Sequence, residues 1–267
     1  MTNPQYQTIL CKVEDSIAYV TFNRPDVHNA FNDVMIRELI EVFSDIEKLS
    51  EVRVVVVSGQ GKSFCAGADL NWMRRVKDYS YEENLRESSE LSDMLFGMYS
   101  FPKPTIARVN GAAIGGGTGL VAVCDIAIAA DSAKFSFSEV KIGLIPACIS
   151  PYVVKKCGEG RCREFFLTGE RMTAERALGA GLVNKVVAME ELDQTVDQFA
   201  HQLISSGPEA IMRCKELLRN VPLMTYDEVK RYTAEVIAQI RGSEEGQEGM
   251  TAFLEKRKPK WLKDSDG

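Results

Sequence analysis

A run of four consecutive valines, Val54–Val57, constrains the fold of this chain more than any other sequence feature. Consecutive β-branched side chains favour a strand, and a strand that is apolar at every position is typical of one buried on both faces of a sheet. An earlier segment has the apolar spacing of a helix, at Phe31, Met35, Leu39, Val42, Phe43, Ile46 and Leu49. A helix followed by a buried strand predicts an α/β domain.

Further extended segments alternate with helical ones along the first half of the chain. We predict strands at 17–22, 105–109, 126–129 and 134–137, and a polar helix that ends near Ser100. Beyond Ser150 only Leu182 to Val187 reads as extended, and Gly207-Pro208 predicts a break before a helical unit. We therefore divide the chain into an α/β core, residues 1–206, and a C-terminal helical segment, residues 207–267.

The charge of the chain argues against several classes of partner. Of its 267 residues, 32 are Lys or Arg and 38 are Asp or Glu, which gives a formal net charge of -6. Such a protein has no bulk attraction for nucleic acid or anionic lipid, so we expect neither as a partner. The first residues lack the pattern of a secretory signal, and no apolar run reaches membrane length. We expect a soluble, cytoplasmic protein.

Cysteine and histidine residues form no metal-binding or hydrolytic pattern. The seven cysteines are scattered without a CxxC pair, and the two histidines, His28 and His201, lie far apart in the sequence. A disulfide framework, a metal site and Ser-His-Asp chemistry are therefore not expected. Cys148 has no evident neighbouring base, so we assign it a packing role.

Two loops of small residues are the candidate ligand-binding elements, FCAGAD at Phe64–Asp69 and GGGTG at Gly115–Gly119. Small side chains let the backbone approach a ligand closely, and the second loop opens a helix whose first N–H groups are free to bind it. Such loops are tight turns, phosphate-binding elements or the two halves of an oxyanion hole. GxGxG followed by Asp131 is close to a dinucleotide-binding fingerprint, but that interpretation leaves FCAGAD unexplained.

Three segments in this order carry a family resemblance: FCAGADL, NGAAIGGGTGLVAVCDIAIA and AKFSFSEVKIGLIP. Together with EEGQEGMTAFLEKRKP, they resemble the crotonase, or enoyl-CoA hydratase/isomerase, superfamily from about Ile17 to Trp261. ADLNWMRR and SEVKIGLIPACISPYVV more specifically resemble the bacterial methylglutaconyl-CoA hydratases of leucine and acyclic-terpene breakdown. The resemblance implies a ClpP-like spiral of ββα units, a C-terminal helical trimerisation segment, and a homotrimer or a hexamer built from two trimers.

The same resemblance implies which residues act on an acyl-CoA thioester. The backbone N–H groups of Ala68 and Gly116 would hold the thioester oxygen, and Glu139 in FSFSEV would be the acid and base. One such N–H donor stabilises a transition state by about 3 kcal/mol. Partial burial beside the acyl chain would raise the pKa of Glu139, which favours proton transfer. No cofactor and no metal is implied, because CoA is part of the substrate.

Gly119 departs from the pattern of the enoyl-CoA hydratases in this family. Those enzymes carry a second glutamate at the corresponding position, in GGGxE, so this chain lacks the usual pair of carboxylates. One glutamate still suffices if it takes a proton from water and returns it to the same face of the double bond. We expect a hydratase that adds water across the 2,3 double bond of an enoyl-CoA, or eliminates water to form it, with 3-methylglutaconyl-CoA as the substrate. The alternatives are a Δ3,Δ2-enoyl-CoA isomerase and a non-catalytic subunit that binds CoA esters.

The resemblance also implies contacts to CoA from the first small-residue loop and from the C-terminal helical segment. The residues concerned are Ala66, Ala68, Asp69 and Leu70 in the first loop and Phe253 and Lys256 near the C-terminus. The last two would reach a CoA bound by their own or a neighbouring subunit. Lys256 is followed by Arg257 and Lys258, a basic cluster suited to the polyanion CoA.

A methylglutaconyl chain ends in a carboxylate, which needs a cation. Arg74, Arg75 and Lys77 follow the first small-residue loop closely and are the candidates.

Overall fold

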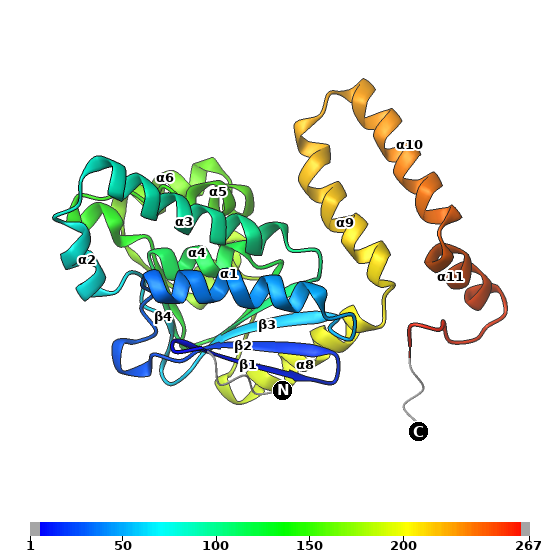
Figure 1. Cartoon of the computed structure of the whole chain (residues 1–267), viewed down its shortest axis with the longest axis horizontal. Coiled ribbons are helices and arrows are strands. Elements are labelled where there is room, and N and C mark those ends of the chain that lie inside the picture. The colour runs from blue at the N-terminus through cyan, green and yellow to red at the C-terminus, as the bar shows by residue number, and fades with distance from the viewer. Residues whose placement is uncertain (1–5, 263–267) are drawn as a thin grey trace.

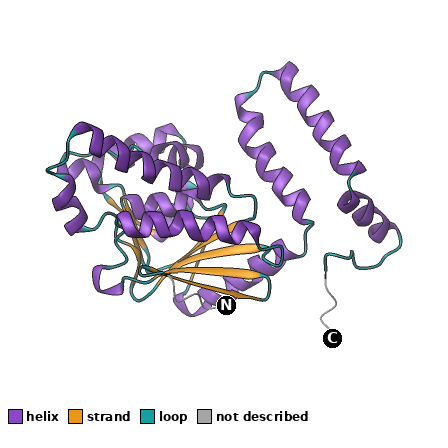
Figure 2. Ribbon diagram, in the orientation of Figure 1, coloured by secondary structure: helices purple, strands orange, loops and turns teal. Residues whose placement is uncertain are grey.

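The structure, a computed structural model, describes residues 6–262. Two β-sheets lie beside a layer of helices, and three C-terminal helices extend away from this body (Figure 1). The larger sheet has the order β1 (Ile9–Glu14), β2 (Ile17–Phe22), β3 (Val54–Gly59), β5 (Thr105–Val109), β7 (Ile126–Ala130) and β10 (Lys185–Val187). The smaller sheet has the order β4 (Ser63–Cys65), β6 (Ala112–Ile114), β8 (Lys134–Ser136) and β9 (Arg171–Thr173). Figure 2 shows the strands in orange against the helical layer.

Successive strands from β3 to β8 alternate between the two sheets. β3, β5 and β7 join the larger sheet, and the strand after each of them joins the smaller one. Helices follow each pair: α2 (Leu70–Val76) and α3 (Tyr81–Ser100), then α4 (Gly116–Val123), then α5 (Ser150–Cys157) and α6 (Glu159–Thr168). Neighbouring strands are parallel except β1 with β2 and β8 with β9. The expected spiral of ββα units is therefore confirmed.

The valine run lies in β3 and separates two hydrophobic cores. Its second and fourth valines pack into the larger core, together with apolar residues of α1 (Asp33–Lys48). Its first and third valines pack into a smaller core with apolar residues of α8 (Leu192–Ile204). Side chains alternate along a strand, so consecutive valines serve opposite faces. The predicted burial on both faces is confirmed, since each valine is at most 1% exposed.

The sequence analysis did not predict four of the strands. β4, β6 and β9 have three residues each, too few to show a period of two; β8 and β10 are equally short but lie within the longer predicted segments 134–137 and 182–187. β1 was overlooked although its residues alternate between more and less buried. β9 shows that Leu182 to Val187 is not the only extended segment after Ser150. Within that segment only β10 is a strand, and it follows α7 (Ala174–Ala180) after a turn.

Three helices complete the described chain: α9 (Pro208–Asn220), α10 (Tyr226–Gly242) and α11 (Glu244–Leu254). α9 begins at the proline of the Gly207-Pro208 pair, as predicted. The ammonium of Lys215 lies 2.6 Å from the carboxylate of Asp125, and Arg219 donates to the carbonyl of Ser100 at 2.7 Å. These contacts fasten α9 to the core.

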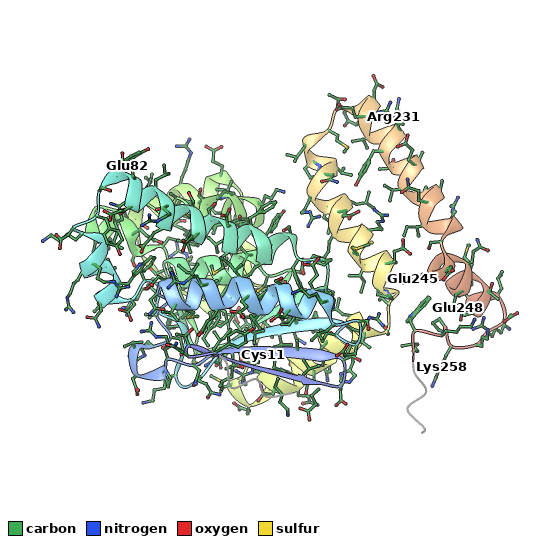
Figure 3. The ribbon with its side chains drawn as sticks, in the orientation of Figure 1. Cys11, Glu82, Arg231, Glu245, Glu248 and Lys258 are labelled. Atoms are coloured by element: carbon green, nitrogen blue, oxygen red, sulfur yellow. The ribbon has the colours of Figure 1, made fainter. Side chains whose placement is uncertain are left out.

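The C-terminal helices also hold one another. Glu245 of α11 accepts hydrogen bonds from the backbone N–H groups of Glu209 and Ala210, both at 2.9 Å (Figure 3). Its carboxylate thus satisfies two donors at the start of α9. No helix within residues 6–262 is long and apolar enough to span a membrane.

Helices α4 and α5 approach closely because Gly119 has no side chain. A Cβ atom at Gly119 would lie 2.0 Å from Cγ2 and 2.7 Å from Cβ of Ile149. Ile149 precedes α5 and is only 3% exposed, so a tightly packed core surrounds it. The packing of α4 on α5 therefore requires glycine at this position.

We predict that Gly119→Ala lowers the free energy of unfolding by about 1–3 kcal/mol, because the new methyl group overpacks against Ile149. The matched control is Gly97→Ala in α3, where an added Cβ meets no atom within 4 Å. That control should raise the free energy of unfolding by up to about 1 kcal/mol, the difference in helix propensity. Denaturant titration of both variants measures the two changes.

A double variant tests the cause. Gly119→Ala combined with Ile149→Ala should lose less stability than the two single changes added together, because the closest clash, with Cγ2 of Ile149, is removed and only the contact with Cβ remains. Gly119→Ala as stable as Gly97→Ala would contradict the packing argument.

Candidate active site

The loop between β4 and α2 is held against Phe31 by two hydrogen bonds. The Phe31 N–H donates to the Gly67 carbonyl at 2.8 Å, and the Asp69 N–H donates to the Phe31 carbonyl at 2.9 Å. In this parallel bridge the backbone N–H of Ala68 faces away from Phe31. Among the contacts of residues 6–262, the Ala68 N–H makes no hydrogen bond. It is therefore free to bind a ligand.

Asp69 has a structural task in the same loop. Its carboxylate caps α2 by accepting from the Asn71 and Trp72 N–H groups, at 2.7 and 3.1 Å, and pairs with Arg24 at 2.7 Å. Burial acts to raise its pKa, but the Arg24 bond and the two backbone bonds outweigh burial, so the pKa lies below its usual value. The Asp69 side chain therefore stabilises the loop, and the contact of Asp69 with CoA stays a prediction.

The second small-residue loop joins β6 to α4. Gly115 has a φ of 55°, a left-handed value that favours glycine, and its N–H donates to the Ser136 carbonyl at 2.7 Å. Gly116 is the first residue of α4, so its N–H has no partner within the helix. It also makes no other hydrogen bond in the described part of the chain.

The two loops touch through their glycines. A Cβ atom at Gly67 would lie 2.8 Å from the Ile114 carbonyl oxygen and 3.9 Å from the backbone nitrogen of Gly116. A Cβ atom at Gly117 would lie 2.1 Å from the Cys65 carbonyl oxygen. Close backbone approach therefore brings the free N–H groups of Ala68 and Gly116 to one place, which is the arrangement an oxyanion hole needs.

Glu139 lies beside this pair of donors. It belongs to a short 3-10 helix, Ser138–Ile142, and its Oε1 atom is 3.1 Å from the position of a Cβ atom on Gly115. Its Oε2 atom is buried without any hydrogen-bond partner. Burial raises the pKa of Glu139, and a backbone hydrogen bond opposes the shift only in part. The structure thus brings Glu139, Ala68 and Gly116 together.

No second carboxylate stands where the two-glutamate hydratases would carry one. The space in front of Gly119 is filled by the side chain of Ile149. A glutamate at position 119 would meet that side chain before it reached the loops. The site therefore has one unpaired carboxylate beside its two free N–H groups.

A cavity of about 530 Å³ extends from Ala68 between α2 and α3. Its walls are apolar over most of their length, with Trp72, Met73, Leu91, Ile142 and Leu144 among the lining residues. Such a cavity suits an acyl chain attached to a thioester bound at the loops.

The structure separates the three candidate cations near this cavity. Lys77 lines the cavity, whereas Arg75 pairs with Asp33 at 2.6 Å and Arg74 donates to Asn71 at 2.6 Å. Arg74 and Arg75 were candidates for the cation that binds the terminal carboxylate, but they do not line the cavity.

The remaining predicted CoA contacts lie in different places. Ala66 lies within the first loop, and Leu70 follows the loop, exposed at the start of α2. Phe253 and Lys256 lie in and after α11, which extends away from α2 and α4 (Figure 1). One chain by itself does not bring these two C-terminal residues to the loops.

The expected basic cluster at the C-terminus is partly neutralised. Arg257 pairs with Glu248 at 2.6 Å and with Glu255 at 2.7 Å, and Figure 3 labels Glu248 on α11. Lys256 makes no side-chain hydrogen bond or ion pair within residues 6–262.

Within the described part of the chain, neither a metal-binding cluster nor the Cys148 thiol adds a reactive group to this site. No three His, Cys, Asp or Glu side chains of the described residues come close enough to hold a metal ion. Burial raises the pKa of the Cys148 thiol, whose sulfur lies 3.7 Å from the Ser88 carbonyl oxygen. A thiol of raised pKa is a poor nucleophile at neutral pH.

Two residues that shape the loops were missed as site residues. Phe31 was assigned to a helical stripe, but it lies before α1 and its ring is 2.6 Å from the position of a Cβ atom on Gly116. Ile149 lies within the segment SEVKIGLIPACISPYVV but was given no role there. Both are ordinary apolar residues, and no sequence signal distinguishes them from the rest of the core.

Comparison with known proteins agrees with this geometry. The family model described as enoyl-CoA hydratase/isomerase matches residues 12–264. The short-chain-enoyl-CoA hydratase of Clostridium acetobutylicum is 33% identical over 257 residues, which cover 95% of this chain and 97% of the relative. The crotonyl-CoA hydratase of Syntrophomonas wolfei is 32% identical over 260 residues, covering 96% of this chain and 98% of the relative.

Solved structures show the same fold. The crystal structure of an enoyl-CoA hydratase from Shewanella pealeana superposes with a TM-score of 0.94 at 41% identity, over 96% of this chain and 97% of the other. The family match spans nearly the whole chain and includes both small-residue loops and Glu139. This chain belongs to the enoyl-CoA hydratase/isomerase family.

Proposed function

We propose that this protein hydrates the 2,3 double bond of an enoyl-CoA thioester, with Glu139 as the only acid and base. The observation that carries the proposal is the buried, unpartnered Oε2 atom of Glu139 beside two free backbone N–H groups. An unpaired carboxylate of raised pKa is poised to exchange a proton. The hydratase names of the relatives support the same reaction class.

The reaction follows from these three groups. The N–H groups of Ala68 and Gly116 bind the thioester oxygen and draw electron density from the double bond, which makes Cβ electrophilic. Glu139 takes a proton from water as the water oxygen bonds to Cβ, and the π electrons move through Cα to form an enolate. Glu139 then delivers that proton to Cα. One water molecule is added, and the carboxylate is restored.

Within this class we propose 3-methylglutaconyl-CoA as the substrate. The segments ADLNWMRR and SEVKIGLIPACISPYVV support it, because they resemble those of bacterial methylglutaconyl-CoA hydratases. The apolar cavity beside Ala68 supports a branched acyl chain in this position.

A Δ3,Δ2-enoyl-CoA isomerase is the second candidate. One observation favours it: the single carboxylate at Glu139 is enough to move a proton between two carbons, and Ile149 fills the place of a second. The same oxyanion hole would stabilise the dienolate of that reaction.

We also propose that helices α9–α11 form a trimerisation segment and complete a neighbour's CoA site. An apolar groove between α9 and α10 and the exposure of Phe253, 83%, support burial against another subunit. Lys256, with no ion pair within residues 6–262, is suited to a CoA phosphate there.

Glu139→Gln tests the catalytic assignment. We predict a fall in turnover of about 100- to 10,000-fold, because the amide keeps the shape of the carboxylate but accepts no proton. The parent should lose activity as the pH falls through the Glu139 pKa, which burial places above its ordinary value of 4.5. Steady-state kinetics across pH measures both effects. A variant with unchanged turnover would exclude Glu139 as the acid and base.

The same variant should fold at least as stably as the parent at pH 7. A carboxyl group whose pKa is raised in the folded state costs stability where it is ionised, and this cost disappears below its unfolded pKa. Glutamine removes the cost. Denaturant titration at pH 7 and at pH 4 checks the sign, and loss of stability at pH 7 would point to a structural role instead.

Absorbance of the conjugated thioester separates hydratase from isomerase. Adding the enzyme to a 2-enoyl-CoA should lower the absorbance as water adds to the double bond. Adding it to a 3-enoyl-CoA should leave the absorbance unchanged. A rise with the 3-enoyl-CoA and no fall with the 2-enoyl-CoA would replace the hydratase proposal with the isomerase. A panel that includes crotonyl-CoA and 3-methylglutaconyl-CoA tests the acyl chain.

A further inference from the structure

We infer that Lys77 selects acyl chains that end in a carboxylate, as a specificity-determining residue of the cavity between α2 and α3. The inference rests on the proposed function, because it places the acyl chain of the thioester in this cavity. Of the three neighbouring cations Arg74, Arg75 and Lys77, only Lys77 is assigned this selectivity for a terminal carboxylate.

The cavity runs from the oxyanion donors toward the connection between the two helices. Trp72 Nε1 donates to Glu87 Oε2 at 2.9 Å, so the first turn of α2 faces the second turn of α3. Asn84, one turn earlier on α3, donates to the carbonyls of Tyr79 and Ser80 in the connection, at 3.2 and 3.0 Å. Lys77 follows α2 at that same end, whereas Ala68 lies at the other.

The ammonium of Lys77 has no partner among residues 6–262, since it makes neither an ion pair nor a hydrogen bond. Of the described residues, Lys77 is also the only basic one that lines this cavity. Arg74 and Arg75 lie on α2 and contact Asn71 and Asp33, respectively. Neither of them lines the cavity. A chain bound along the apolar walls would therefore meet one uncompensated positive charge at its far end.

The groups that face Lys77 suit a carboxylate there. Among the described residues that line the cavity only Glu87 is acidic; its Oε2 atom accepts from the Trp72 indole, which holds this carboxylate against the first turn of α2, before Lys77. Ser88 adds a hydroxyl that has no side-chain partner within the described chain. Lys77 is exposed at the rim, so a terminal carboxylate would pair with it and keep part of its hydration, which lowers the desolvation cost.

Two five-carbon substrates test this inference: glutaconyl-CoA, which ends in a carboxylate, and 2-pentenoyl-CoA, which does not. Lys77→Met should lower the ratio of kcat/KM for glutaconyl-CoA to that for 2-pentenoyl-CoA by about 3- to 10-fold, the worth of a partly exposed charge pair. The change should lie mainly in KM. Lys77→Arg should keep the ratio, because it keeps the charge. Arg74→Met, which removes a charge outside the cavity, is the matched control.

Two results would overturn the inference: an unchanged ratio in Lys77→Met, or an equal fall in Arg74→Met. Calorimetric binding of the saturated esters glutaryl-CoA and valeryl-CoA separates this inference from the proposed function. A preference for glutaryl-CoA that Lys77→Met abolishes, in a protein that hydrates neither enoyl-CoA, would reject the hydratase and uphold the role of Lys77. Hydration of both enoyl-CoAs with no preference between the saturated esters would uphold the hydratase and reject the role of Lys77.

Discussion

The close approach of the two small-residue loops is the constraint on which the rest of the site depends. β4 and β6 are parallel neighbours in the smaller sheet, so the loops that follow them leave the sheet at the same edge. Gly67 and Gly117 let each loop touch a carbonyl of the other strand's end, where any side chain would collide. Phe31 fixes the first loop through two backbone hydrogen bonds. The two free N–H groups are thus positioned by backbone packing. Neither position 68 nor position 116 needs a side chain larger than a methyl group for this purpose.

Two carboxylates near these loops have opposite environments, and this difference separates structure from chemistry. Asp69 accepts bonds from a helix N-terminus and from Arg24, which hold its pKa down and keep it ionised. Glu139 is buried with one oxygen unpartnered, and its pKa is raised. A pair of acids whose surroundings move their pKa values apart is a common sign of an acid/base site. The first carboxylate stabilises the loop, while the second is left available for proton transfer.

The sequence predicted the parts of this molecule that are long or chemically distinctive. The valine run indicated a strand buried on both faces, and the glycine loops with Glu139 indicated the site. Strands β4, β6 and β9 escaped because three residues are too few to show an alternation, whereas the equally short β8 and β10 lie within longer segments that read as extended. Arg74, Arg75 and Lys77 are equivalent as a row of cations, and only the directions of their side chains tell them apart. Ile149 was invisible because its role depends on a contact with Gly119, which no local pattern encodes.

The central claim is that both backbone N–H groups bind the thioester oxygen in front of Glu139. A crystal structure with butyryl-CoA, a saturated ester that cannot be hydrated, tests it most directly. The account predicts the thioester oxygen at about 2.7–3.1 Å from the backbone nitrogens of both Ala68 and Gly116, with Cα facing Glu139. A thioester oxygen that contacts only one of these groups, or neither, would contradict it.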